Sequence, residues 1–325
     1  ESSRFTQNTV LTCRHKKENK AASDYFCVMR SVLITGANGF IGQYLAAQLL
    51  QKGYKVIATG KGESRLTIQH PQLVYETLDF TQKEAVGQLL LKYKPHTVVH
   101  AGALSKPDEC ELNKEAAFLV NVTGTLNLLQ AARQSASFFV YLSTDFVFEG
   151  SRLDYTEEDA LQPVNYYGQT KKLAEEEVKQ YPFDWSIVRT ILVYGHPRGI
   201  RHNILTLVAN GLKEGRSLKI VDDQVRTPTY VEDLVKGIVS IIEGEKRGTY
   251  NLSGKDVTTP YRMACAAADY LGLDKTKIEK VTAESFNEPA RRPRTTGFDL
   301  TKARQELGYE PLSFEEGLKK TFEDL

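Results

Sequence analysis

Two periods of apolar and polar positions alternate along most of this chain, one typical of buried strands and the other of helices. Short apolar runs rich in β-branched residues predict strands, and the longer segments between them carry apolar residues at helical spacing. The expected strands are 32–35, 55–59, 73–78, 96–101, 138–143 and 185–189, and the helices between them include 41–51, 83–93 and 116–133. Strands that alternate with helices predict right-handed crossovers, and hence an α/β fold with a doubly wound parallel sheet.

The pattern differs at the two ends of the chain. Residues 1–28 are polar and show neither period, so we expect a disordered tail, with a transit peptide as the alternative interpretation. After Gly195 the regularity loosens, with helices expected near 231–243 and 261–271 and a short strand at 249–252. We therefore expect a sheet domain over 29–195 and a smaller lobe over 196–325, with parts of 229–252 packing back on the sheet.

A glycine-rich turn follows the first expected strand and opens a helix. It reads Thr35-Gly36-Ala37-Asn38-Gly39-Phe40-Ile41-Gly42. The first glycine permits a tight turn, the second lets backbone amides approach a pyrophosphate, and the third allows close helix packing. This context predicts dinucleotide binding, with a plain strand-to-helix turn as the alternative. Ligands of such sheets bind at the carboxyl ends of the strands, which places Gly36, Gly102 and Thr144 along one cleft.

The most informative stretch is Tyr167-Gly-Gln-Thr-Lys171, which lies in an expected helix. Residues at i and i+4 share a helix face, so the phenol and the ammonium should lie together. A nearby cation is expected to lower the pKa of the phenol and make it usable for proton transfer at neutral pH. Tyr166 and Lys172 have no matching partner, because the residues at the required spacing are Thr170 and Gly168.

Taken together, the glycine turn, Leu142-Ser143-Thr144-Asp145 and the Tyr167–Lys171 pair resemble the extended short-chain dehydrogenase/reductase family. The resemblance implies a Rossmann domain over 29–195 and a substrate-binding lobe over 196–325. It also implies an NAD(P)-dependent oxidoreductase, with Tyr167 as the proton donor, Thr144 polarising the carbonyl and Lys171 holding the nicotinamide ribose. Ser143 is the less favoured choice, because it should point to the other face of its strand. Asn121 resembles a structural asparagine that ties strands together.

The resemblance also assigns the cofactor contacts, and the nature of the cofactor depends on the end of the second strand. There Lys61 and Arg65 could pair with a 2′-phosphate and no acid ends the strand, so we expect NADP(H), with NAD(H) as the alternative. Asp79 matches the family position that contacts the adenine, although it could equally cap the next helix. The expected cofactor-binding residues are Gly36, Asn38, Gly39, Phe40, Ile41, Gly42, Lys61, Arg65, Asp79, Phe80, Ala101, Gly102, Ala103, Tyr167 and Lys171.

Within the family, several segments look like those of dTDP-4-dehydrorhamnose reductases, and the resemblance runs from Met29 to the end. They include 143–150, 165–171, 188–190, 222–224, 228–230 and 292–293. They imply reduction of a nucleotide 4-keto sugar, whose diphosphate would suit Arg226 or Arg292 as fork-shaped anion partners. The expected substrate-binding residues are Asp145, Asn203, Arg226, Tyr230 and Arg292. The chain departs from these reductases at 191–192, where they commonly carry a tryptophan, and at Thr296 and Gly297.

Two other functions stay open. One is a nucleotide-sugar epimerase or dehydratase, because the Phe40-Ile41 form of the glycine turn is closer to the sugar epimerases. The dehydratase is less favoured, because Asp145 is followed by Phe146 where that class needs a glutamate. The other is a non-catalytic NADP-binding regulatory protein like the regulatory subunit of methionine adenosyltransferase, which resembles this chain at 261–265 and acts by binding a partner.

Composition narrows these functions further. Lysine plus arginine (42) nearly balances aspartate plus glutamate (41), so no overall field recruits nucleic acid or an acidic membrane. The four cysteines lack Cys-x-x-Cys or Cys/His spacing, which predicts neither a metal site nor a disulfide framework and favours a cytoplasmic location. No apolar run approaches the ~18 residues that a membrane helix needs. We therefore expect a nucleotide-sugar substrate, no nucleic acid or membrane partner, and a homodimer as the candidate assembly.

Overall fold

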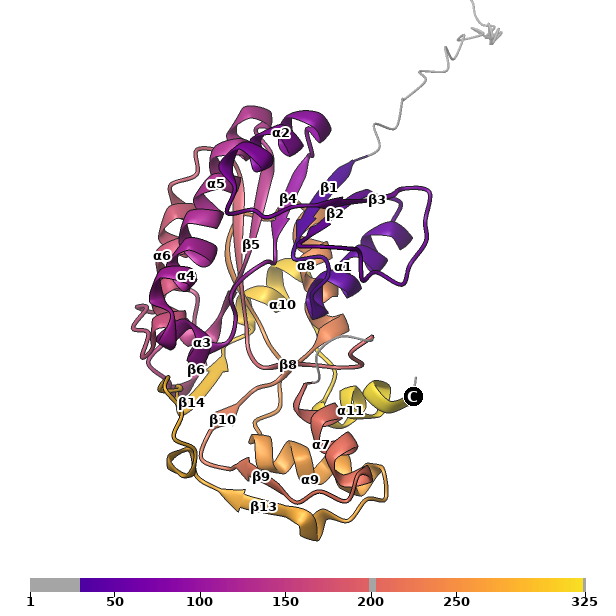
Figure 1. The fold of residues 1–325 in the computed structure, drawn as a ribbon, viewed down its shortest axis with the longest axis vertical. Coiled ribbons are helices and arrows are strands. Elements are labelled where there is room, and N and C mark those ends of the chain that lie inside the picture. Colours follow the sequence, from indigo (N-terminus) through magenta and orange to yellow (C-terminus); the bar gives the residue numbers. More distant parts are fainter. Residues whose placement is uncertain (1–29, 199–202, 324–325) are drawn as a thin grey trace, which may run out of the picture.

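The computed structural model of the chain describes residues 30–198 and 203–323. The tail expected over 1–28 lies outside the described residues. The fold is built on a seven-stranded, fully parallel sheet that forms its larger part (Figure 1). In their order across the sheet, its strands are β12 (Gly248–Leu252), β7 (Trp185–Thr190), β5 (Phe138–Thr144), β4 (Thr97–His100), β1 (Ser31–Thr35), β2 (Lys55–Gly60) and β3 (Leu73–Thr77). The expected α/β class and doubly wound sheet are confirmed.

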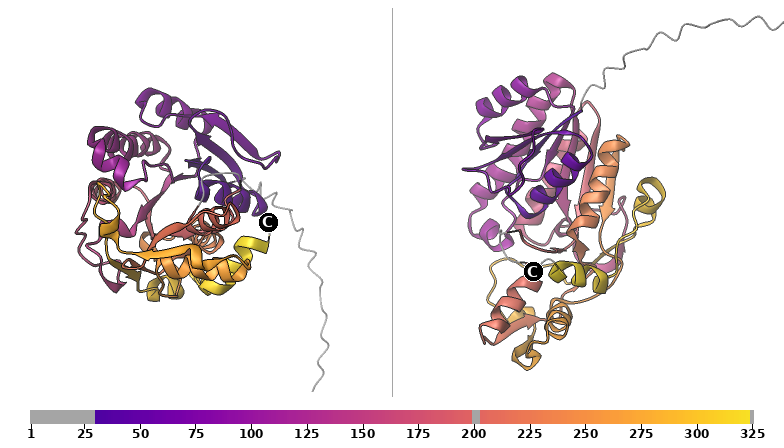
Figure 2. Two further views of the ribbon diagram at one scale, coloured as in Figure 1. Left: turned by 60° about the horizontal axis from the view of Figure 1, so that its bottom comes forward. Right: turned by 90° about the vertical axis from the view of Figure 1, so that its right-hand side faces the viewer.

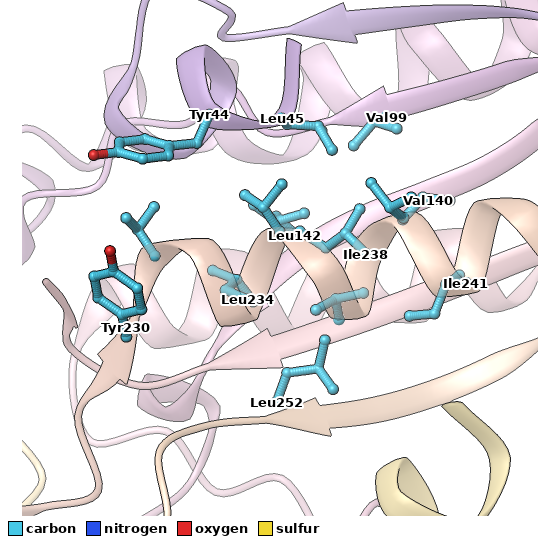
Figure 3. Close-up of a cluster of buried hydrophobic side chains, with 14 of the residues drawn as sticks. Tyr44, Leu45, Val99, Val140, Leu142, Tyr230, Leu234, Ile238, Ile241 and Leu252 are labelled. Carbon is cyan, nitrogen blue, oxygen red and sulfur yellow. The ribbon is translucent and has the colours of Figure 1, made fainter. Parts of the chain in front are cut away.

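Helices cover both faces of this sheet because successive strand residues point to opposite sides. One face packs against helices α2 (Lys83–Tyr93), α5 (Gly124–Ala132) and α6 (Tyr166–Lys179), with the strands contributing Leu33, Ile57, Val98, Tyr141 and Ile187. The other face packs against α1 (Phe40–Gln51) and α8 (Val231–Glu243). Figure 3 shows α8 laying Leu234, Ile238 and Ile241 against this second face, opposite Val140, Leu142 and Leu252.

The smaller lobe lies beyond the carboxyl ends of the strands, at the bottom of Figure 1, and both views of Figure 2 show it packed against the sheet domain. Its strand sets are β10–β14–β6, β8–β11 and β9–β13. Their bounds are β6 Ser151–Tyr155, β8 Val193–Tyr194, β9 Leu218–Val221, β10 Val225–Arg226, β11 Thr229–Tyr230, β13 Ile278–Val281 and β14 Thr295–Phe298. The remaining helices are α3 (Pro107–Leu112), α4 (Lys114–Phe118), α7 (Ile204–Lys213), α9 (Pro260–Tyr270), α10 (Thr301–Leu307) and α11 (Phe314–Glu323).

The chain crosses between the two parts more often than a single boundary at residue 195 would allow. A segment within 229–252 packs on the sheet, since β12 pairs with β7 and α8 covers one face. Strand β6, which precedes residue 195, instead pairs with β14 in the lobe. The two parts are therefore interleaved along the sequence.

One expected helix contains a π-helical turn. The segment 116–133 forms the end of α4, a π-helical turn over Leu119–Thr123, and then α5. The side chain of Asn121, in the π-helical turn, donates to the Leu104 carbonyl and to Thr170 (both 3.0 Å), and its oxygen accepts from the Leu104 amide. The π-helical turn thus directs the Asn121 side chain into the interior, where Asn121 links the loop after β4 to helix α6. This agrees with a structural role for Asn121.

Candidate active site

The glycine turn is shaped as a phosphate cradle requires. Gly36 has a φ of +69°, and a Cβ there would lie 2.8 Å from both the Ala101 carbonyl oxygen and Gly102. A Cβ on Gly42 would overlap the Gly36 oxygen and lie 2.7 Å from the Ala37 Cα, so this glycine lets α1 pack closely. Gly39 caps α1 without a side-chain hydrogen bond. The amides of the first helical turn, which lack intrahelical acceptors, are therefore left to a ligand.

Asn38 holds the segment that carries the two expected phosphate-binding cations. Its amide donates to the Glu63 carbonyl (2.9 Å) and to the Tyr75 hydroxyl (2.8 Å), and its oxygen accepts from the Arg65 amide (2.8 Å). Asn38 therefore joins the glycine turn to residues 61–65. Both cations are exposed at the surface, as a contact with a phosphate requires.

Lys61 is engaged more closely than the sequence suggests. Its ammonium lies 2.9 Å from a carboxylate oxygen of Asp79, and the other oxygen accepts from the amide and hydroxyl of Thr81. Asp79 thus closes the turn before α2, a role of the kind given as its alternative, although Gln82 occupies the N-cap position of the helix and makes no side-chain cap. These contacts lower the pKa of the Asp79 carboxyl although burial opposes them. Lys61 would have to leave Asp79 to meet a phosphate.

The ring of Phe80 packs closely against two glycines, Gly102 and Gly124. A Cβ on Gly102 would come within 2.6 Å of its ring, and a Cβ on Gly124 within 2.5 Å. The ring is buried and packs edge-on against His100, with ring centres 5.0 Å apart. The described contacts of Phe80 are therefore packing contacts behind the loop that contains Ala101, Gly102 and Ala103.

The two residues of the Tyr167–Lys171 pair are buried on α6, and their contacts with Thr144 and Leu142 place them at the carboxyl end of β5. The ammonium of Lys171 donates to the Leu142 carbonyl at 2.7 Å and lies 4.0 Å from the centre of the Tyr141 ring. Burial lowers the pKa of Lys171 to about 7, although the Glu175 carboxylate opposes this. Lys171 therefore lies close to its titration point at neutral pH.

The pKa of Tyr167 departs from the sequence-based expectation. Burial raises the pKa of its phenol well above the usual value, the charges of Asp145 and Cys110 act in the same direction, and a hydrogen bond with Thr144 opposes them. The lowering of this pKa expected from Lys171 is not found, because the Lys171 ammonium is engaged with the Leu142 carbonyl and the Tyr141 ring and desolvation dominates the phenol. The phenol stays protonated at neutral pH, which suits a proton donor.

Thr144 lies between Tyr167 and a buried carboxyl. Its hydroxyl donates to Asp145 at 3.1 Å and accepts from the Phe146 amide at 3.3 Å. Asp145 also accepts from Thr296 at 2.6 Å, and the Arg226 guanidinium lies 3.7 Å away. Burial raises the pKa of Asp145, although these neighbours oppose the rise. The buried Ser143 hydroxyl has no hydrogen-bond partner in the described part of the chain.

The five expected substrate-binding residues are not brought together as a free set. Arg226 is buried, and it donates to the carbonyls of Val225, Pro293 and Arg294 as well as facing Asp145. A guanidinium so engaged is not the free anion partner that the sequence suggested, because each of those contacts would be lost on turning toward a ligand. Its position beside Asp145 and Thr296 is instead a structural one.

The other three members have local roles. Arg292 is paired with Asp108 (2.7 Å) and Glu288 (2.6 Å) yet keeps 18% of its side chain exposed. Asn203 caps α7 by accepting from Leu205 and Thr206, and Tyr230 is buried at the start of α8.

Two further features of this region were not found from the sequence. Tyr141 lies under Lys171, a contact that the alternation of β5 could have suggested, because Tyr141 and Ser143 share a strand face and α6 covers that face. Glu175 and Arg189 form a buried ion pair, with nitrogen and oxygen 2.7 Å apart, one turn beyond Lys171. Their pairing joins α6 to β7 over a sequence separation that no local pattern reports.

Residues 30–198 and 203–323 contain neither a candidate metal site nor a candidate membrane-spanning helix. These residues contain no cluster of His, Cys, Asp or Glu that could hold a metal ion. None of the helices formed by them is long and apolar enough to cross a membrane.

Comparison with known proteins assigns the family. The family described as RmlD substrate binding domain matches residues 29–325. The rat methionine adenosyltransferase 2 subunit beta is 30% identical over 279 residues, covering 84% of this chain and 81% of the relative. The spore coat polysaccharide biosynthesis protein SpsK of Bacillus subtilis is 30% identical over 297 residues, 91% of this chain and 98% of the relative.

Among solved structures, dTDP-4-dehydrorhamnose reductase of Bacillus anthracis in complex with NADP superimposes with a TM-score of 0.80 at 29% identity, covering 91% of this chain and 99% of that one. The match to the family spans all of the described residues and therefore includes both parts of the fold. The chain therefore belongs to the RmlD substrate-binding-domain family, an extended short-chain dehydrogenase/reductase family.

Proposed function

We propose that this protein is an NADP(H)-dependent reductase of a nucleotide 4-keto sugar. The observation that carries the proposal is the arrangement of Tyr167, Thr144 and Lys171 at the carboxyl end of β5. The glycine turn lies at the corresponding end of β1 in the same sheet. A dTDP-4-dehydrorhamnose reductase solved with NADP, 29% identical to this chain, shares this fold.

The residues present fit a dinucleotide. The amides at the start of α1 and the space left by Gly36 and Gly39 would hold the pyrophosphate. Lys61 and Arg65 would meet a 2′-phosphate, and Lys171 would hold the nicotinamide ribose. When bound, NADPH supplies the hydride that reduces the keto carbon of the substrate.

The residues of the chain supply the proton and the orientation. The phenol of Tyr167, which burial keeps protonated, donates its proton to the keto oxygen as the alcohol forms. The hydroxyl of Thr144 would turn from Asp145 to the same oxygen and stabilise the charge that develops there. The exposed edge of Arg292 is the remaining cation proposed for the substrate diphosphate.

The test is an assay of NADPH oxidation against a panel of nucleotide 4-keto sugars that includes dTDP-4-dehydrorhamnose. We expect turnover with at least one member and none with the corresponding 4-hydroxy sugars. Binding of NADPH without reduction of any keto sugar would contradict the proposal.

A second candidate is a regulatory binding role. It is favoured by the 30% identity with the methionine adenosyltransferase 2 subunit beta over 84% of this chain. The test mixes the protein with a methionine adenosyltransferase catalytic subunit and measures the mass of the product by light scattering. A stable complex together with no reductase turnover would favour this candidate, whereas turnover without a complex would favour the reductase.

A further inference from the structure

Lys171 carries an ammonium in a nearly closed space between α6 and β5. Its side chain is 3% exposed, and one of its donors is used by the Leu142 carbonyl. The ring of Tyr141, which is fully buried, lies with its centre 4.0 Å from the ammonium. Water has little access to this charge, so the side chains that surround it decide whether the ammonium form persists.

The ionisable groups that face Lys171 do not provide a free counter-charge. On α6, Glu175 favours the ammonium, but both of its carboxylate oxygens already accept from Arg189. On β4, His100 lies between Thr35 and Thr125, and burial lowers its pKa to about 3, which leaves it neutral. The phenol of Tyr167, also on α6, stays protonated and therefore carries no charge either. Beside the Leu142 carbonyl, the described group that contacts the ammonium is the face of the Tyr141 ring.

We propose that Tyr141 is a positioning residue whose ring face holds Lys171 as an ammonium beside Tyr167. The inference rests on the proposed function for its purpose, since the charged form of Lys171 is the one that would hold the ribose. The physical basis is the attraction between a cation and the negative face of an aromatic ring, which is strongest where water is excluded. The Tyr141 hydroxyl has Thr125 as its neighbour, although without a hydrogen bond of ordinary geometry, and the contact with the ammonium is made by the ring.

The first experiment measures the titration of Lys171 directly and requires no substrate. Protein labelled with ¹³C-lysine is titrated by NMR, and the Lys171 signal is identified by its absence in Lys171→Met. We expect the wild-type inflection near pH 7, and in Tyr141→Leu an inflection lower by about one unit, the scale of a desolvated cation–π contact. An inflection unchanged in folded Tyr141→Leu would overturn the proposal.

Two controls separate the ring's charge distribution from its packing. Phe139 is buried on the same face of β5 two residues earlier, and Phe139→Leu should leave the Lys171 inflection in place. Phenylalanine analogues with increasing fluorine substitution at position 141 keep nearly the same volume while weakening the ring face. The pH of the Lys171 inflection should fall stepwise as fluorine atoms are added. An inflection that does not change with fluorination would overturn the proposal even if Tyr141→Leu fails to fold.

Activity provides a second readout. If the protein reduces a keto sugar, the alkaline limb of kcat/KM should follow the NMR inflection in each variant, and activity lost in Tyr141→Leu at pH 8 should recover toward wild type at pH 6. If the alkaline limb of kcat/KM lies at the same pH in wild type and in Tyr141→Leu, the proposal would be contradicted. Absence of turnover in wild type would contradict the proposed function but leave the NMR result to decide the role of Tyr141.

Discussion

The guanidinium of Arg189 on β7 binds the carboxylate of Glu175 on α6 through two of its nitrogens, one helical turn beyond Lys171. Both side chains are at most 1% exposed, and a third nitrogen of Arg189 donates to the Glu157 carbonyl. Tyr167 and Lys171 precede Glu175 on the same helix. The Glu175–Arg189 ion pair therefore fixes the axial position and the rotation of that helix against the sheet. The position of the candidate site residues on α6 thus depends on an ion pair that is itself buried.

Removing one member of that pair should destabilise the fold strongly. Arg189→Leu leaves the Glu175 carboxylate buried and unpaired, which typically costs about 3–5 kcal/mol of unfolding free energy. Chemical denaturation measures the effect. The double variant Arg189→Leu with Glu175→Leu should recover part of the loss. Lys172→Ala breaks an exposed pair with Glu176 on the same helix and should cost well under ~1 kcal/mol, so equal losses would contradict this account.

Turnover should depend on the hydroxyl of Tyr167. Tyr167→Phe keeps the buried ring in place and removes the proton donor, so NADPH affinity should survive while kcat falls by ~10²-fold or more. Tyr166→Phe is the matched control, because Tyr166 is only partly buried and lies beneath Lys114. Steady-state kinetics with the best keto sugar measure both variants. Similar losses at the two positions would remove the proposed role of Tyr167.

The stability gained by Lys171→Met should depend on pH. The folded-state pKa of Lys171 is lowered to about 7, from 10.5, so between these values the unfolded chain binds more protons than the folded one. The cost of burying the ammonium is present in full below pH 7 and falls as pH rises toward 10.5. Urea denaturation at pH 6 and pH 9.5 should therefore show a larger gain for Lys171→Met at pH 6. An equal gain at both values would mean that Lys171 is not titrating in this range.

NADPH should bind more tightly than NADH, through the two cations after β2. Removing both cations with Lys61→Ala and Arg65→Ala should weaken the binding of NADPH about 10-fold or more, since charge-assisted contacts are worth about 1.5–3 kcal/mol. The affinity for NADH should be nearly unchanged. Asp79→Asn releases Lys61 from its ion pair and gives an independent measure of that competition. Fluorescence titration at two salt concentrations checks the affinities, and tighter binding of NADH by wild type would reverse the assignment.

Close packing at the glycine turn predicts a sharp difference between two alanine substitutions. In Gly42→Ala the new methyl would overlap the Gly36 carbonyl, so folding or cofactor binding should be lost. Gly87 lies within α2 with nothing within 4 Å of a Cβ, and Gly87→Ala should be neutral or stabilise by up to ~1 kcal/mol. Thermal unfolding with and without NADPH compares them. Equal behaviour would mean that Gly42 is not a contact point of α1 with the turn.

Local patterns predicted most of the sheet domain. The six expected strands differ from β1, β2, β3, β4, β5 and β7 by at most one residue at either end, because short apolar runs bounded by turns define parallel strands well. The spacing of Tyr167 and Lys171 likewise predicted their shared helix. The segment expected as a helix over 116–133 is helical, but five of its residues are π-helical, where Asn121 contacts Leu104 and Thr170 from elsewhere in the sequence.

The environment of each site residue could not be predicted in the same way. A tyrosine and a lysine four residues apart suggest mutual electrostatic effects, yet burial by other elements dominates both pKa shifts. Arg226 looked like an anion ligand because its partners, the carbonyls of 293 and 294 and the carboxyl of Asp145, come from distant segments. Lys61 looked free for the same reason. Chemistry-bearing residues are visible in a sequence, whereas their long-range contacts are not.

The return of β12 to the edge of the sheet has a consequence for dissecting the protein. Strand β12 and helix α8 come from the second half of the chain, yet α8 covers the sheet face that contains Val140 and Leu142 (Figure 3). A fragment ending at residue 195 would leave this apolar face and the edge of β7 open to water, where neighbouring copies could pair with it. The first half therefore cannot serve as an independent module, and a truncated variant must retain β12 and α8 to keep the sheet covered.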